Sequence, residues 1–248
     1  QKREQELKER RRKEEKERKQ REEEERKQRE EENQNIASDG PPGTLAWAEK
    51  KFAEVMASND QFTDEEWPFG EARLGKRHKD DVCKWVRATE YNKGRGKPRL
   101  YEDGLDAKDI SQGSSGTCYL LAAMATIAHQ HPDLLKKMFL KHDIDKGIFM
   151  IKFYGSTYKG EKECVVLLDD YLPLGTWSGG EPANFLAFNR PYGYRANRSK
   201  NVDMELWATL LEAAYVKINS SDPNRCGTFE ENYGGFSDEA VRYNNKKR

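Results

Sequence analysis

The sequence predicts an α+β domain, because two apolar helical segments are separated by two β-prone runs. Residues 119–130 are rich in Leu, Ala, Met and Ile nearly all round, which predicts a buried helix that ends near Pro132. Residues 203–219 place large apolar side chains on one wide face with Asp203 as the cap, so we expect this helix to pack against the first. Between them, residues 148–154 and 164–168 surround a polar turn and predict a small hairpin. The order helix, hairpin, helix is typical of an α+β fold.

Residues 1–35 form a charged N-terminal extension. They are almost entirely Lys, Arg, Glu and Gln, and Leu7 is their only large apolar residue. Acidic residues recur four positions before basic ones, in the pairs Glu4–Lys8, Glu9–Lys13, Glu14–Arg18, Glu22–Arg26 and Glu25–Arg29. Each pair adds about 0.2–0.5 kcal/mol to an isolated helix. We expect a solvated single helix or a disordered spacer, with a specific binding arm as the alternative, because the apolar repeat of a coiled coil is absent.

A linker and a lead-in segment follow the charged extension. Residues 36–44 are dense in turn formers and cannot continue a helix. Residues 45–100 are expected to pack on the main domain, beginning with apolar positions at helical spacing over residues 45–56 and a break at Trp67 and Pro68. Trp47, Trp67 and Trp85 are interpreted as core anchors, because large aromatic side chains mostly serve packing.

Composition argues against several function classes. The 44 basic residues balance the 44 acidic residues, so the charge gives no reason to expect nucleic acid or an anionic membrane as a partner. The four cysteines form no CxxC pair, which indicates neither a disulfide framework nor a zinc site; they are Cys83, Cys118, Cys164 and Cys226. No apolar run approaches the ~20 residues of a membrane span, and the given sequence shows no signal-peptide pattern. We therefore expect a soluble, cytoplasmic protein.

The residues before the first buried helix form a candidate nucleophile site. A polar loop with glycines at 113 and 116 leads directly into Cys118, which starts the helix. The unpaired N–H groups and positive dipole end of a helix N-terminus favour the thiolate form of a cysteine. The Gln112 amide is placed to donate to a developing oxyanion, and the glycines allow close approach of the reacting carbonyl. The pattern suits acyl transfer with Cys118 as nucleophile, although a cysteine beside an apolar helix is more often an inert buried residue.

Several ordered motifs in residues 101–241 resemble the calpain family. The string QGSSGTCYLLAA resembles the family's nucleophile motif, VVLLDDYLPLG its strand ending in a DD-x-LP turn, and ELWATLLEAAYVKIN its following helix. Phe229, Glu230, Gly234 and Gly235 resemble the stretch that comes next. The resemblance implies that residues 101–248 are the first, Cys-bearing subdomain of a papain-like protease core. It further implies a calcium-dependent cysteine endopeptidase that cleaves protein substrates.

Two positions depart from the family pattern. Thr117 stands where calpains carry Asp, and Tyr119 stands where they carry Trp. A tyrosine can still supply an aromatic wall, but its hydroxyl changes substrate fit or thiolate shielding. These departures motivate the alternative function, a catalytically inactive calpain-like protein that binds calcium or other proteins.

None of the four histidines suits the general base that a cysteine protease needs. His129 lies eleven residues along the same predicted helix, about 16 Å from Cys118. His131 is farther, and His78 and His142 lie in polar surroundings typical of surface residues. In calpains the His and the Asn that orients it come from a second subdomain. The chain begins with Gln1 and stops at Arg248 before that subdomain would start, so we expect a fragment that is nearly inactive alone.

The resemblance also implies a regulatory Ca²⁺ site. Asp109 and Glu205 match the carboxylate ligands of the first calpain calcium site, and Glu102 and Gly104 match positions that supply backbone carbonyls. Oxygen ligands of this kind are what Ca²⁺ requires. The family's basic residue two positions before the aspartate is Ala107 here.

The adjacent carboxylates Asp169 and Asp170 have a structural interpretation. They follow a predicted strand, so we expect them to end it and to brace a turn at Leu172 and Pro173 rather than to bind metal.

Overall fold

The structure is a computed structural model that describes residues 23, 40–78, 82–91, 97–101, 104–113, 115–154, 163–176, 182–184, 205–222 and 224–235. The chain divides into two compact units, Gln1–Pro42 and Gly43–Arg248. Within residues 1–35, only Glu23 is described, and it is helical. The expected charged helix therefore lies almost entirely outside the described residues.

The predicted hairpin is confirmed as part of a three-stranded antiparallel sheet. Strand β3 (Ile148–Tyr154) pairs with β4 (Glu163–Asp169), with Ile148 opposite Asp169 and Tyr154 opposite Glu163. A further strand, β2 (Phe139–Asp143), pairs with the other edge of β3. The sequence analysis missed β2 because its central residues are exposed and it lacks a buried apolar face.

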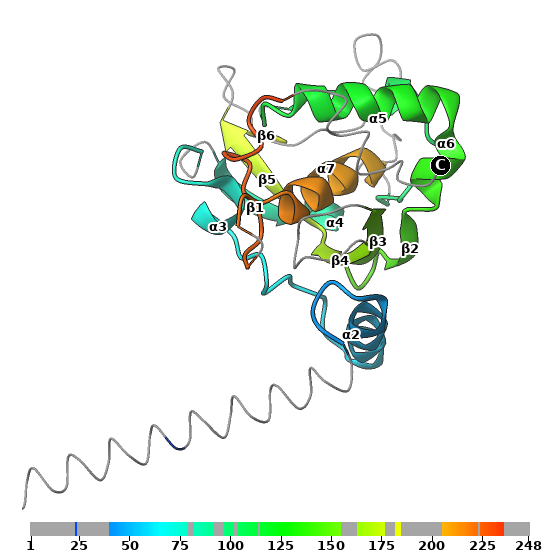
Figure 1. The fold of residues 1–248 in the computed structure, drawn as a ribbon, viewed down its shortest axis with the longest axis vertical. Helices are drawn as coiled ribbons and strands as arrows, with labels where there is room; N and C mark the ends of the chain where they lie inside the picture. The colour runs from blue at the N-terminus through cyan, green and yellow to red at the C-terminus, as the bar shows by residue number, and fades with distance from the viewer. Residues whose placement is uncertain are drawn as a thin grey trace, which may run out of the picture. The chain divides into compact units, whose positions relative to one another are not determined.

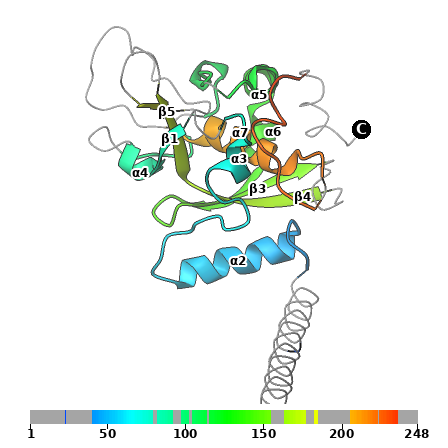
Figure 2. The same ribbon diagram turned by 90° about the vertical axis from the view of Figure 1, so that its left-hand side faces the viewer.

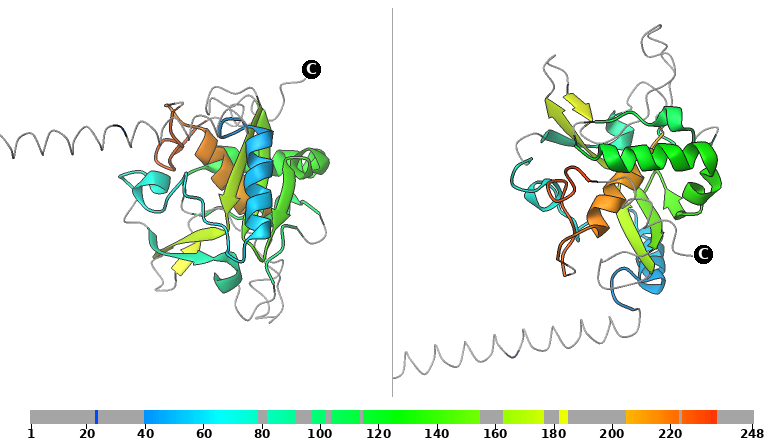
Figure 3. Two further views of the ribbon diagram at one scale, coloured as in Figure 1. Left: turned by 90° about the horizontal axis from the view of Figure 1, so that it is seen from below. Right: turned by 45° about the horizontal axis from the view of Figure 1, so that its top comes forward.

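Helices cover both faces of this sheet, as Figures 1 and 2 show. Residues Ile148, Met150, Val165 and Leu167 point to one face, where α2 (Leu45–Ala57) packs on them. Figure 3 shows α2 lying along β3 and β4 from below. The alternate residues of β3 and β4 point to the main core, beneath α7 (Trp207–Ile218). This two-residue alternation is what a sheet buried on both faces requires.

The two predicted buried helices are confirmed and touch each other. Helix α5 (Cys118–Gln130) contacts α7 through the rings of Tyr119 and Tyr215, whose centroids are 6.3 Å apart at 71°. Every residue of α7 is buried. The sequence placed the end of the first helix correctly, but Pro132 then begins another short helix, α6 (Pro132–Lys136).

Helix α7 starts four residues later than predicted. Leu206 is the residue before the helix, and Asp203, the predicted cap, lies outside the described residues. The Leu206 N–H donates to the Arg99 carbonyl at 2.9 Å, and the Trp207 N–H donates to the Leu100 carbonyl at 3.1 Å. These bonds hold the chain before α7 against residues 99–100 and satisfy N–H groups that a longer helix would use.

A second three-stranded sheet was not predicted. Strand β5 (Tyr171–Thr176) lies between β1 (Val82–Arg87) and β6 (Pro182–Asn184), all antiparallel, and short helices α3 (Glu71–Leu74) and α4 (Ala88–Tyr91) flank β1. The expected turn at Leu172 and Pro173 is wrong, because both residues lie inside β5 opposite β1. Asp169 and Asp170 do serve packing: each forms a buried ion pair with an arginine.

The tryptophans contribute to the core as expected. Trp67 is 1% exposed, stacks on Phe229 with a centroid distance of 6.1 Å, and donates its indole N–H to the Gly227 carbonyl at 2.8 Å. Trp47 and Trp85 are half-buried and pack on the two apolar clusters. Among the helices of the described residues, none is long and apolar enough to span a membrane.

Candidate active site

Cys118 is the first residue of α5, and its side chain is exposed as a free thiol. The helix behind it is anchored in the core by Leu120, Leu121 and Met124. A nucleophile needs access to its substrate and a rigid support, and the first position of a buried helix provides both.

The loop before Cys118 is ordered by short-range bonds. A 3₁₀ turn, η1 (Ala107–Asp109), begins with a capping box. The Asp106 side chain accepts from the Lys108 N–H, and the Asp106 N–H donates to the Asp109 side chain. Gln112 follows on the exposed part of the loop. Gly116 has a φ of 72°, which a residue with a side chain rarely adopts. The chain thus turns sharply two residues before the nucleophile.

A distant segment, residues 228–235, lies against this loop. The Gly234 N–H donates to the Gly116 carbonyl at 3.1 Å, and the Tyr233 ring covers the Cα of Gly116 so closely that a Cβ there would collide with it. The segment is fixed by Phe229, whose N–H donates to the Arg73 carbonyl at 2.9 Å. The sequence analysis used Gly234 only as part of a resemblance and missed Tyr233. A tyrosine before two glycines gave no signal without the fold.

The aromatic residue next to the nucleophile points inward. Tyr119 is 6% exposed and packs on Tyr215 and Gly235, whereas Tyr233 is 54% exposed beside the loop. The expectation that Tyr119 changes a substrate wall is therefore not supported by its placement. Tyr233 is the aromatic residue whose ring is exposed next to Gly116.

The histidines are distributed as follows. His129 and His131 lie at the far end of α5 and are exposed, and His142 lies on the edge strand β2. His78 was expected at the surface, but it is 8% exposed and stacks on Tyr233 with a centroid distance of 5.5 Å. Burial in an aromatic contact corrects the earlier expectation for His78.

Two of the four residues matched to a calcium site come together. The Asp109 and Glu205 carboxyl groups lie close enough to interact, although they are far apart in sequence. Burial raises the pKa of Asp109, the Asp106 carboxylate raises it further, and hydrogen bonds to Asp106 and Glu205 lower it. Gly104 is described, whereas Glu102 lies outside the described residues. The described residues contain no group of three or more His, Cys, Asp or Glu side chains that could hold a metal.

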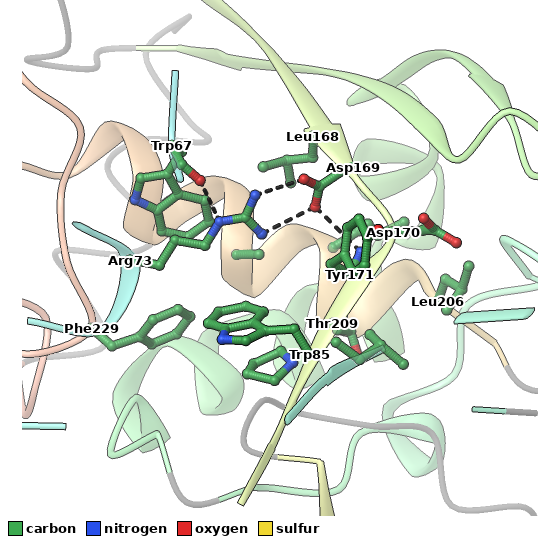
Figure 4. A pocket seen from close by; sticks show the side chains of 14 residues that line it. Trp67, Arg73, Trp85, Leu168, Asp169, Asp170, Tyr171, Leu206, Thr209 and Phe229 are labelled. Atoms are coloured by element: carbon green, nitrogen blue, oxygen red, sulfur yellow. Dashed lines mark hydrogen bonds and ion pairs between the residues drawn. The ribbon is translucent and has the colours of Figure 1, made fainter. Parts of the chain in front are cut away.

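Two hollows of the described structure are lined by other residues than Cys118 and Gln112. One is a space of about 20 Å³ in the apolar interior, shown in Figure 4. Its walls include Trp67, Trp85 and Phe229, and Arg73 crosses it to reach Asp169. The other is a surface hollow of about 620 Å³ lined by Glu66, Lys76, Cys226 and neighbouring residues. The first is the size of one water molecule and belongs to the packing of the core.

Comparison with known proteins gives a consistent family signal. The sequence model described as calpain family cysteine protease matches residues 62–242, well over half of the chain. The catalytic subunit of calpain-2 from Gallus gallus is 31% identical over 195 residues, which cover 74% of this chain and 24% of that protein. Calpain-A from Drosophila melanogaster is 27% identical over 213 residues, covering 82% of this chain and 23% of that protein. The chain spans about a quarter of the length of these relatives.

Proposed function

Because the chain belongs to the calpain family of cysteine proteases, we propose that it acts as a calcium-dependent cysteine endopeptidase on protein substrates, with Cys118 as nucleophile. The observation that carries the proposal is the exposed Cys118 thiol at the first position of the buried helix α5. The positive end of a helix dipole attracts negative charge, and a buried helix keeps the sulfur at one position.

Peptide cleavage at this site is acyl transfer. The Cys118 thiolate attacks the carbonyl carbon, and the oxyanion that forms accepts hydrogen bonds from the Gln112 amide and the backbone N–H of Cys118. The C–N bond then breaks as the amine takes a proton, and water hydrolyses the thioester to release the acid and restore the thiol. Gln112 is exposed on the same loop as Cys118, which supports this role.

The base and the second wall of the cleft are proposed to come from a second subdomain that carries His and Asn. Three of this chain's histidines lie on α5's far end or on β2, and the Cys118 thiol is exposed. A nucleophile on an open surface suits a site that is completed by a facing subdomain.

We further propose that Asp109, Glu205 and the backbone carbonyls of Glu102 and Gly104 hold a regulatory Ca²⁺. Asp109 and Glu205 bring two carboxyl groups from distant parts of the sequence close together, and carboxylate and carbonyl oxygens are the ligands that Ca²⁺ prefers. A bound Ca²⁺ supplies positive charge that stabilises both carboxylates. Asp109 belongs to η1 before the nucleophile loop and Glu205 lies two residues before α7, so a bound ion would tie the loop to the core.

A reducing, cytoplasmic location is proposed for the protein. Cys118 is an exposed free thiol in the structure, and a nucleophilic cysteine must stay reduced.

Proteolysis of unfolded casein by the full-length protein, with calcium or with a chelator, tests the proposal. We expect the protein to cleave casein when calcium is present. The Cys118→Ala variant should not cleave casein, even when more calcium is added. Calcium binding without any Cys118-dependent cleavage would favour the alternative, a catalytically inactive calpain-like binding protein.

A further inference from the structure

Three buried oxygen-bearing side chains meet directly behind the start of α5. Glu212 on α7 and the loop residues Ser115 and Thr117 are all 0% exposed. Ser115 Oγ donates to Glu212 Oε1 at 2.5 Å, and Thr117 Oγ1 donates to the same oxygen. The two hydroxyl oxygens lie 2.8 Å apart. One carboxyl group therefore binds the residues on both sides of Gly116.

The Thr117 hydroxyl is turned away from the helix that it precedes. Thr117 is the N-cap residue of α5, where a threonine hydroxyl usually accepts a bond from an N–H of the first turn. Here no side chain caps α5. The Thr117 carbonyl still accepts from Leu120 at 2.9 Å and Leu121 at 3.1 Å, so the helix starts normally. Glu212 thus keeps a side-chain cap from occupying N–H groups next to Cys118.

The loop is held from both sides at its sharpest point. Glu212 binds its inner side, while the Gly234 N–H and the Tyr233 ring contact Gly116 on the other. Because glycine is conformationally permissive, the backbone at Gly116 could rotate without these contacts and redirect the chain at Cys118, two residues later.

We propose that Glu212 is a positioning residue for Cys118, an inference that rests on the proposed protease function. Its carboxyl group fixes the backbone on each side of Gly116, and with it the direction of the Cys118 sulfur and of the N–H groups at the helix start. A 1 Å misplacement of a reacting group can cost on the order of 10²-fold in rate. Thr117 carries half of this contact, which gives a structural role to one of the two departures from the calpain motif.

The test uses the full-length protein and variants that change hydroxyl or carboxyl groups with little change in volume. Thr117→Val removes one hydroxyl, Ser115→Ala removes the other, and Glu212→Gln keeps an oxygen that can accept from both. Thr126→Val is the matched control, because the Thr126 hydroxyl bonds to the Ala122 carbonyl at 2.8 Å on the exposed side of the same helix. The readouts are the iodoacetamide alkylation rate of Cys118 relative to Cys226, kcat and KM for a peptide substrate, and the thermal midpoint.

We expect Thr117→Val and Ser115→Ala to lower the Cys118 to Cys226 rate ratio and kcat by about tenfold or more, with KM nearly unchanged. Glu212→Gln should keep most of the parental rate ratio and kcat, because its amide oxygen can accept both hydrogen bonds. Thr126→Val should change neither the rate ratio nor kcat. If folded Thr117→Val and Ser115→Ala proteins keep the parental rate ratio, Glu212 only stabilises the fold and the inference is overturned. If Cys118 of the unaltered protein reacts no faster than Cys226, the proposed function itself fails.

Discussion

Arg73 reaches Asp169 through two hydrogen bonds of 3.0 and 2.7 Å in the interior of the protein. The two side chains are 3% and 0% exposed, and the guanidinium group also lies 4.9 Å from the centroid of the Trp67 ring. The pair thereby joins helix α3 to the last residue of β4, just before the chain enters β5 of the second sheet. Paired bonds of this kind need the planar fork of an arginine.

Removing this pair should destabilise the whole domain. Arg73→Ala leaves a buried carboxylate without its partner, and we expect a loss of about 3–5 kcal/mol in the free energy of unfolding. Arg73→Lys should recover only part of it, because a lysine cannot make the paired bonds. Urea denaturation measures both. Lys51→Ala, which breaks the exposed Lys51–Glu54 pair, is the control and should cost less than about 1 kcal/mol.

An alanine at Gly116 should be harmful for two separate reasons. The positive φ costs about 1–2 kcal/mol for a residue with a side chain, and the new Cβ would collide with the Tyr233 ring. Gly234 offers a control, since it has a φ of 74° and nothing within 4 Å of the added Cβ. We expect Gly116→Ala to cost at least 1 kcal/mol more than Gly234→Ala, following the usual cost of overpacking of about 1–3 kcal/mol. Thermal or urea denaturation gives both values.

In a Tyr233→Ala background the collision is gone but the backbone strain remains. The cost of Gly116→Ala should then fall to that of Gly234→Ala. An unchanged difference between the two glycines would show that Tyr233 does not restrict this position.

Calcium should stabilise the parent protein and should do so through Asp109 and Glu205. At a concentration 100 times the dissociation constant, a ligand adds about 2.7 kcal/mol to the free energy of unfolding. Asp109→Asn should remove most of this gain. Without calcium the same variant should be at least as stable as the parent at neutral pH, because burial raises the pKa of Asp109 and so disfavours its ionised form.

The matched control for the calcium experiment is Asp145→Asn, at an exposed acidic residue near Lys97. Its protein should keep the full calcium response in a thermal melt. Equal calcium responses in the two variants would contradict the assignment of Asp109.

His142 should add a pH dependence to the stability of the β2–β3 edge. His142 is exposed on β2, but the chain packed around its ring partly removes it from water and so lowers its pKa, while the Asp143 carboxylate raises it to a smaller degree. The folded protein therefore favours the neutral ring, which stacks on Phe149. The stability that the neutral His142 ring contributes is fully present above pH 6.5, the ordinary pKa of a histidine. It is lost as the pH falls through the lowered pKa of the folded protein.

The His142→Gln variant should consequently lose less stability than the parent between pH 6.5 and pH 5. Urea denaturation at several pH values measures the difference. NMR titration of the His142 ring in the folded parent gives an independent check, since a midpoint at or above 6.5 would rule out the explanation.

The sequence predicted the parts of the fold that have a strong local pattern. Helices α2 and α5 and the β3–β4 hairpin have regular apolar spacing, and they appear close to the predicted bounds. Strand β2 has an exposed centre, and β5 contains Pro173, so neither resembles a buried strand until its partner is known. The start of α7 was missed because its N–H groups are satisfied by residues 99–100, which are about a hundred positions away.

The candidate site likewise contains residues that the sequence could predict and residues that it could not. Cys118 and Gln112 could be predicted because a glycine loop before an apolar helix is a local pattern. Glu212 could not, because its acidic side chain lies within an otherwise apolar helix and its role depends on contacts with Ser115 and Thr117. Tyr233 contacts Gly116 across more than a hundred residues of sequence, and only the fold reveals that contact.

The pH dependence of Cys118 alkylation tests the central claim most directly. Iodoacetamide labelling of the full-length protein in calcium, with mass spectrometry of the Cys118 and Cys226 peptides, follows both thiols in one sample. If the start of α5 holds a reactive thiolate, Cys118 should react faster than Cys226 at pH 6 and should keep much of its pH 8.5 rate. Parallel loss of both rates between pH 8.5 and pH 6 would contradict the assignment of Cys118 as the nucleophile.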